Sequence, residues 1–145
     1  MPNHFHLLIQ EIADGGITQF MRKLGTAYGM YFNVKNERIG NLFVKPFRSK
    51  HVHDDRYLRH VAQYIHLNAA NVLEPSFKHG TTRGFDTLER KVRAYKYSSS
   101  PDYAGALRPE LHILSTDAMA IIADDLPSLK ESLETAAEYR AGLEL

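Results

Sequence analysis

The sequence predicts an α+β domain with a short helical tail, and three observations point to this class. Residues 5–9 contain an apolar run, and residues 47–53 alternate in side-chain type, as strands do. Residues 18–32, 54–71 and 85–97 place apolar side chains three and four positions apart, which is typical of amphipathic helices. With 145 residues, 43% of them hydrophobic, the chain is long enough for one domain with a core.

Composition restricts the classes of function. The formal net charge is +1, but residues 1–105 carry 15 Lys and Arg against 9 Asp and Glu, while residues 106–145 carry 3 against 8. A basic body suits a polyanion such as nucleic acid, although two ordinarily solvated surfaces would explain the charges equally well. Without cysteine, disulfides, thiol nucleophiles and thiolate metal sites are excluded. No apolar run is long enough to span a bilayer, so we expect a cytoplasmic protein.

The first nine residues, Met-Pro-Asn-His-Phe-His-Leu-Leu-Ile, contain the most informative local pattern. In a strand, side chains alternate between faces, so His4 and His6 would point the same way, about 6–7 Å apart at the backbone. Two imidazoles in this arrangement can chelate one divalent metal ion. The alternative is two partly exposed strand histidines that bind nothing.

A second His-x-His pair, His51 and His53, offers a rival metal site. Cations flank this pair and would repel a metal ion, so we favour the first pair. Four cations are better interpreted as contacts with nucleic-acid phosphates, because such contacts supply the sequence-independent part of affinity: Lys23, Lys45, Arg48 and Lys50. A solvated basic face is the alternative.

The helix predicted at residues 56–71 follows an N-cap carboxylate from Asp54 or Asp55. Its expected buried stripe consists of Leu58, Val61, Ala62, Ile65 and Ala69. Tyr64 and Asn68 lie one turn apart on the flank of this stripe. Tyr57 shares that flank, His60 lies at its margin, and His66 should lie on the far side.

Residues 106–145 are expected to form an acidic helical extension to a domain of residues 1–105. One short helix should follow Ser115-Thr116, and another should begin at Pro127, with an inner stripe of Leu129, Leu133 and Ala137. We find no catalytic chemistry in this tail.

Two runs, Met-Pro-Asn-His-Phe-His-Leu-Leu at the start and Tyr-Ile-His-Leu-Asn at residues 64–68, resemble those of the single-tyrosine HUH transposases. The resemblance is to their REP-associated tyrosine transposase type, within the insertion-sequence 200-like class, and it covers roughly residues 1–105. Shorter matches lie at residues 31–33, 40–43 and 47–50, and more loosely at residues 97–99. The family has a proline where this chain has Ala69, which removes no reactive group.

The resemblance implies a ferredoxin-like antiparallel sheet with the His-Phe-His strand at its centre. It also implies that His4, His6 and Asn68 hold Mg²⁺ or Mn²⁺, and that Tyr64 attacks single-stranded DNA at hairpin-forming repeats of a mobile or REP element. The products would be a 5′-phosphotyrosine and a free 3′-hydroxyl.

Alternative functions remain open. The chain could be a decayed or domesticated DNA-binding relative, or a metal hydrolase that uses both His-x-His pairs. The family places a strand, a helix and a second strand before the His-Phe-His strand. We therefore expect an N-terminally incomplete sheet, which either pairs with a second copy through its open edge or folds only marginally.

Overall fold

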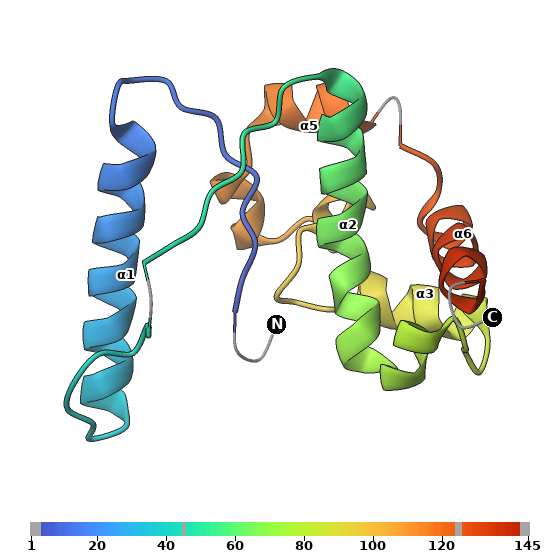
Figure 1. Cartoon of the computed structure of the whole chain (residues 1–145), viewed down its shortest axis with the longest axis horizontal. Helices are drawn as coiled ribbons and strands as arrows, with labels where there is room; N and C mark the ends of the chain where they lie inside the picture. Colours follow the sequence, from blue (N-terminus) through green and yellow to red (C-terminus); the bar gives the residue numbers. More distant parts are fainter. Residues whose placement is uncertain (1–3, 45, 124–125, 143–145) are drawn as a thin grey trace. The chain divides into compact units, whose positions relative to one another are not determined.

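The computed structural model describes residues 4–44, 46–123 and 126–142. Its elements, labelled in Figure 1 where space allows, are α1 (Gly16–Lys35), α2 (Asp55–Leu73), the 3-10 helix η1 (Pro75–His79), α3 (Phe85–Arg93), α4 (Ser100–Tyr103), the 3-10 helix η2 (Pro109–Ile113), α5 (Thr116–Ala123) and α6 (Leu129–Ala141). The chain divides into two compact units. Unit 1 comprises residues 1–7 and 52–145, and unit 2 comprises residues 8–51. Across the described ranges, none of the helices is long and apolar enough to cross a membrane.

The predicted ferredoxin-like sheet is wrong. Helices make up 61% of the chain, and none of the described residues forms a strand. The segments 5–9 and 47–53, which we expected to be strands, have irregular backbone. A strand requires a neighbouring strand that pairs with its N–H and C=O groups. Apolar runs and alternation describe the side chains of a segment but do not supply that neighbour.

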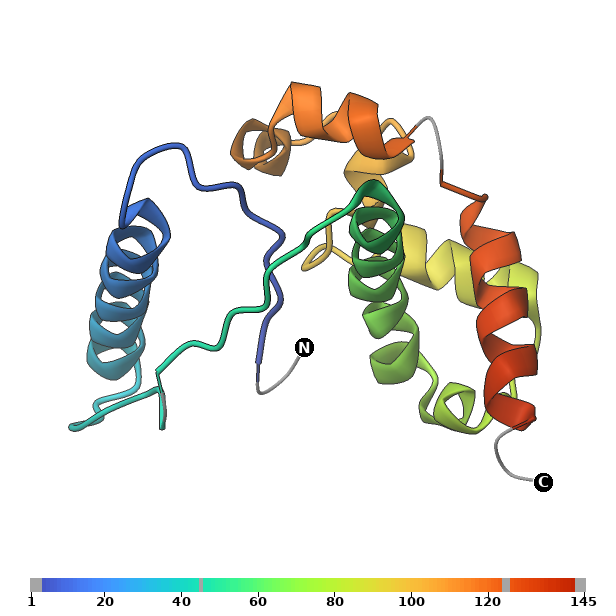
Figure 2. The ribbon, with the colours of Figure 1, turned by 45° about the horizontal axis from the view of Figure 1, so that its top comes forward.

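The core of unit 1 forms where α2, η1, α3 and α6 meet. α2 packs against η1 and α3, and α6 packs against the same two elements (Figure 2). The largest fully buried side chains lie there: Phe77, Leu88, Val92 and Leu133. Complete burial of an apolar side chain of this size contributes about 1.5–3 kcal/mol, so these contacts fix the relative positions of the four elements.

α2 begins where the sequence predicts. The side chain of Asp54 accepts a hydrogen bond from the backbone N–H of Tyr57, at 2.7 Å, and so caps the helix. The buried face is rotated from the predicted stripe: Ala62 and Ala69 are buried, but so are Ala70, Asn68 and His66. The predicted Leu58, Val61 and Ile65 are only half-buried. The rotation follows from the positions of η1 and α3, which the periodicity of one helix cannot specify.

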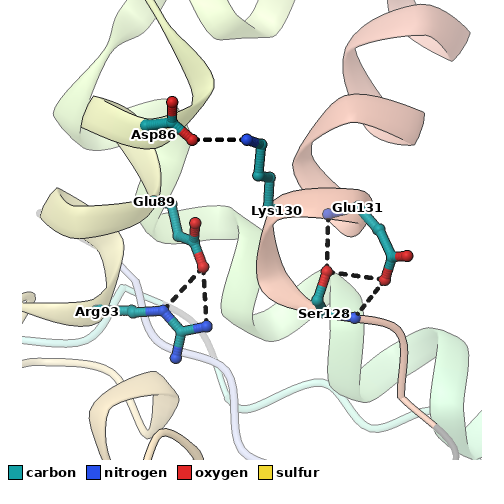
Figure 3. Close-up of polar contacts among 6 residues, drawn as sticks. All are labelled: Asp86, Glu89, Arg93, Ser128, Lys130 and Glu131. Carbon is teal, nitrogen blue, oxygen red and sulfur yellow. Dashed lines mark hydrogen bonds and ion pairs between the residues drawn. The ribbon is translucent and has the colours of Figure 1, made fainter.

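The two tail helices are also present as predicted. α6 begins with a capping box, in which Ser128 and Glu131 each bond the other's backbone N–H (Figure 3). Leu133 and Ala137 enter the core of unit 1, so the helical tail is part of that core. On the surface, Lys130 donates to Asp86 of α3 at 2.6 Å (Figure 3).

Unit 2 contains a single helix among its described residues. The predicted helix is confirmed as α1. Its apolar spacing also predicts a face that packs on a core, but this prediction is wrong, because none of its residues is buried. Phe20, Tyr28 and Tyr31 are about half exposed, at 47%, 48% and 57%. The ring of Phe43 lies 6.3 Å from that of Tyr28. This loop residue covers only part of the apolar face.

Candidate functional site

Three aromatic rings, from the start of unit 1 and from the middle of α2, lie side by side. The ring centroids of His4 and His6 are 5.0 Å apart, with an interplanar angle of 87°. The ring centroids of His6 and Tyr64 are 5.5 Å apart, with an angle of 74°. Half of the Tyr64 surface is exposed, so the side chain is partly open to solvent.

The surroundings of His6 favour its neutral imidazole form. Partial burial and the charge of the neighbouring His4 lower the pKa of His6 below its usual range. Only the neutral ring has a free lone pair for a metal ion. The two rings therefore form a candidate pair of metal ligands, although no strand holds them.

Asn68 lies one turn beyond Tyr64 on α2 and is 7% exposed. Its side-chain Nδ2 donates to the backbone carbonyl of Tyr64 at 2.8 Å, which fixes the amide and leaves its oxygen for another partner. Two imidazole nitrogens and one amide oxygen are donor types that a divalent ion accepts. In the described ranges, no group of three or more His, Asp or Glu side chains could form a fuller ligand set.

The rival histidines lie where unit 2 ends and unit 1 resumes. His51 belongs to unit 2, whereas His53 belongs to unit 1. His53 pairs with the carboxylate of Asp54 at 3.0 Å and stacks on Tyr57, with ring centroids 5.3 Å apart. His53 and Tyr57 border an open hollow of about 490 Å³, which His60 also lines.

The expected phosphate-binding cations belong to unit 2. Lys23 lies on α1, and Arg48 and Lys50 lie in the irregular segment after it; all three are exposed. Lys45 lies outside the described residues. Exposure leaves these side chains accessible to a polyanion, but it does not distinguish a binding face from a solvated one.

Arg140 of α6 is a residue that sequence reasoning missed. Its Nη1 donates to Asn71 Oδ1 and to the carbonyl of Phe77, both at 2.9 Å. Burial lowers the pKa of Arg140, and the charge of the Tyr64 phenolate acts in the opposite direction. No local pattern in the tail could indicate this position, because both anchoring partners lie more than sixty residues earlier.

A second polar cluster lies on another side of α2 and is structural. His66 shares a hydrogen bond of 2.9 Å with Ser99, and burial lowers the pKa of His66 to about 4. Asp102 lies close enough to oppose this shift, but both of its oxygens accept from Arg108. Because Asp102 is engaged there, it does not orient His66, and the three side chains do not form a Ser-His-Asp triad.

Comparison of the chain with family models, with curated proteins and with solved structures found no match. Function must therefore be inferred from the residues and contacts of the chain itself.

Proposed function

We propose that this chain is a metal-dependent single-stranded DNA endonuclease and strand transferase, with Tyr64 as its nucleophile. The observation that supports it best is the meeting of His4, His6 and Tyr64, with neighbouring ring centroids 5.0 and 5.5 Å apart. A phosphodiester bound to an ion at the imidazoles would lie next to the tyrosine hydroxyl. The motif resemblance supports the same roles for these residues.

The proposed reaction exchanges one phosphate ester for another. The Tyr64 hydroxyl oxygen bonds to phosphorus as the bond from phosphorus to the 3′-oxygen breaks. The phenolic proton passes to water, and the departing 3′-oxygen takes a proton from water. The products are a 5′-phosphotyrosine and a 3′-hydroxyl. A second 3′-hydroxyl can reverse the step and join strands, because the tyrosyl ester retains the bond energy.

His4, His6 and the Asn68 oxygen would hold Mg²⁺ or Mn²⁺. When bound, the ion would partly neutralise the negative charge of the scissile phosphate. Imidazole nitrogen suits transition metals better than it suits Mg²⁺, so we expect Mn²⁺ to bind more tightly. The hydrogen bond from Asn68 to the Tyr64 carbonyl orients the amide relative to the nucleophile.

We expect the DNA to be a hairpin-forming single strand whose phosphates contact Lys23, Lys45, Arg48 and Lys50. We also expect the protein to act in the cytoplasm. Pairing with a second copy is a further expectation, since apolar side chains such as Tyr31 and Val34 of α1 are largely exposed, at 57% and 81%.

The second candidate is a DNA-binding protein that does not cleave. One observation favours it: the described residues provide only two imidazoles and one amide oxygen near Tyr64, without a carboxylate. Such a ligand set binds hard divalent ions weakly. This candidate predicts DNA binding without covalent capture.

A denaturing gel separates the two candidates. End-labelled hairpin DNA is incubated with the protein and Mn²⁺ or Mg²⁺, and a chelator is added to parallel samples. We expect a covalent adduct that requires the metal ion and disappears in Tyr64→Phe, while DNA binding stays within a few-fold. Tyr57→Phe is the matched control, because it makes the same change on the same helix. An adduct that persists in Tyr64→Phe would contradict the assignment.

A further inference from the structure

The guanidinium of Arg140 is held in a fixed place in unit 1. Its Nη1 donates both to Asn71 on α2 and to the backbone of Phe77 in η1. Its guanidinium carbon lies 4.7 Å from the centroid of the Phe77 ring, and Phe77 is fully buried. A guanidinium anchored in this way loses little further freedom when it binds an anion.

The anchored guanidinium retains an unused hydrogen-bonding edge. Both bonds to Asn71 and Phe77 come from Nη1, and no described residue accepts from Nε or Nη2. These two nitrogens form the side of the fork that matches two oxygens of a phosphate. By contrast, the Nε and Nη2 groups of Arg93 interact with the carboxylate of Glu89, and those of Arg108 interact with the carboxylate of Asp102.

Arg140 lies on the same side of α2 as the tyrosine. Asn71 follows Tyr64 by seven residues, which is two helical turns, so the two side chains share a face about 10 Å apart along the axis. The guanidinium is also close enough for the Tyr64 phenolate to act on its charge. DNA that places a phosphate at the Tyr64 hydroxyl would therefore bring that phosphate or the next one within reach of the open edge.

From this geometry we propose that Arg140 is a phosphate-binding residue of the Tyr64 site, with Nε and Nη2 taking non-bridging oxygens of the attacked strand. The inference rests on the proposed function and adds to it a cation from the tail helix. Its fixed positive charge opposes the negative charge that collects on the phosphate during attack.

The first measurement is the rate of adduct formation with hairpin DNA and saturating Mn²⁺. We expect Arg140→Gln to lower this rate about 100-fold, as loss of a preorganised donor does elsewhere. Arg140→Lys keeps the charge but loses the fork, so its loss should be smaller. Lys130→Gln is the matched control, because it removes a cation from the same helix whose partner, Asp86, is exposed. It should stay within about two-fold of the parent.

The second measurement distinguishes phosphate contact from support of the fold. Neutral methylphosphonates replace, one at a time, the phosphates flanking the cleavage point. At the phosphate that Arg140 contacts, the replacement should slow the parent protein most, slow Arg140→Lys less, and slow Arg140→Gln little further. A purely structural role would give the same slowing in all three proteins at every position, and would overturn the inference.

The remaining outcomes are also decisive. If the parent forms a Tyr64-dependent adduct and Arg140→Gln forms it equally fast, this inference fails and the proposed function stands. If the parent forms no adduct, both fail. A variant that loses its helical circular dichroism is replaced in the methylphosphonate series by Arg140→Lys, whose result then decides.

Discussion

The two units contain helices of similar length that differ completely in burial. α1 has 20 residues and none is buried, whereas α2 has 19 residues and five are buried. Both helices are amphipathic, but α2 packs within unit 1 against η1, α3 and α6, whereas no described residue of α1 is buried. Amphipathic periodicity is therefore sufficient to predict a helix, while a core also requires a second apolar face to cover it.

The difference matters for the proposed site. Tyr64, Asn68 and Arg140 lie on helices that pack in the core of unit 1, and residues so supported keep a fixed geometry. The cations expected to bind phosphates lie in unit 2, on elements without buried side chains. We therefore expect the chemistry to depend on unit 1 and the strength of DNA binding to depend also on unit 2.

The largest expected effect contrasts two phenylalanines. Phe77→Ala should lower the free energy of unfolding by about 3–5 kcal/mol, because it opens a cavity at a fully buried position. Phe20→Ala makes the same change on α1, where the side chain is 47% exposed, and should cost less than about 1 kcal/mol. Urea unfolding followed by helical circular dichroism measures both. Equal losses would remove the distinction between the units.

A pH titration examines the buried polar cluster of unit 1. Burial holds the pKa of His66 at about 4, against 6.5 for an exposed histidine, so the unfolded chain binds a proton that the folded chain does not. Stability should fall by about 3 kcal/mol as the pH drops from 6.5 to 4. Asp102, whose pKa is lowered by its bond to Arg108, should add a further loss below that range.

The control for this titration is His66→Gln, which removes the titrating group. Its stability should change much less between pH 6.5 and 4. A parent protein whose stability is constant across this interval would show that His66 is solvated.

Two glycines with positive φ give a smaller, matched contrast. A Cβ on Gly80, in unit 1, would lie 2.5 Å from the carbonyl oxygen of Ala137, so α6 would have to move. A Cβ on Gly40, in unit 2, would meet nothing within 4 Å. Both alanine variants carry a left-handed backbone cost of about 1–2 kcal/mol. Gly80→Ala should lose clearly more stability in urea unfolding, and equal losses would argue against close packing of α6.

The smallest expected effect concerns DNA affinity. Arg48→Ala and Lys50→Ala should each reduce the salt slope of single-stranded DNA binding by up to roughly 0.7, if each side chain contacts one phosphate. Fluorescence anisotropy at several salt concentrations measures the slope. Lys130→Ala is the control and should leave it unchanged. Slopes that match the parent in all three variants would mean that Arg48 and Lys50 do not contact the DNA phosphates.

Local signals in the sequence predicted the helices well. The carboxylate of Asp54 marks the start of α2, because capping depends on residues within one turn. Pro127 predicts a helix start two residues before the start of α6. The strands at residues 5–9 and 47–53 failed because pairing depends on a distant partner. The prediction of the buried face of α2 failed for the same reason, because the observed face is rotated toward His66.

The site shows the same division between local and distant information. The spacing of Tyr64 and Asn68 placed them on one flank of α2, and Asn68 does bond the Tyr64 backbone. His4 and His6 could be identified as a pair, but the nearness of their rings to Tyr64 depends on tertiary packing. Arg140 could not be found at all, since its place depends on contacts with Asn71 and Phe77.

The proposed metal site is tested most directly by locating bound Mn²⁺, which broadens the nuclear magnetic resonance signals of nearby side chains. Broadening falls steeply with distance, so it reports which side chains surround the ion whether or not DNA is cleaved. We predict that the first signals lost are those of His4, His6, the Asn68 amide and the Tyr64 ring. His4→Ala with His6→Ala should abolish the effect. Broadening centred instead on His53, Tyr57 and His60, and unchanged by those substitutions, would contradict the proposed site.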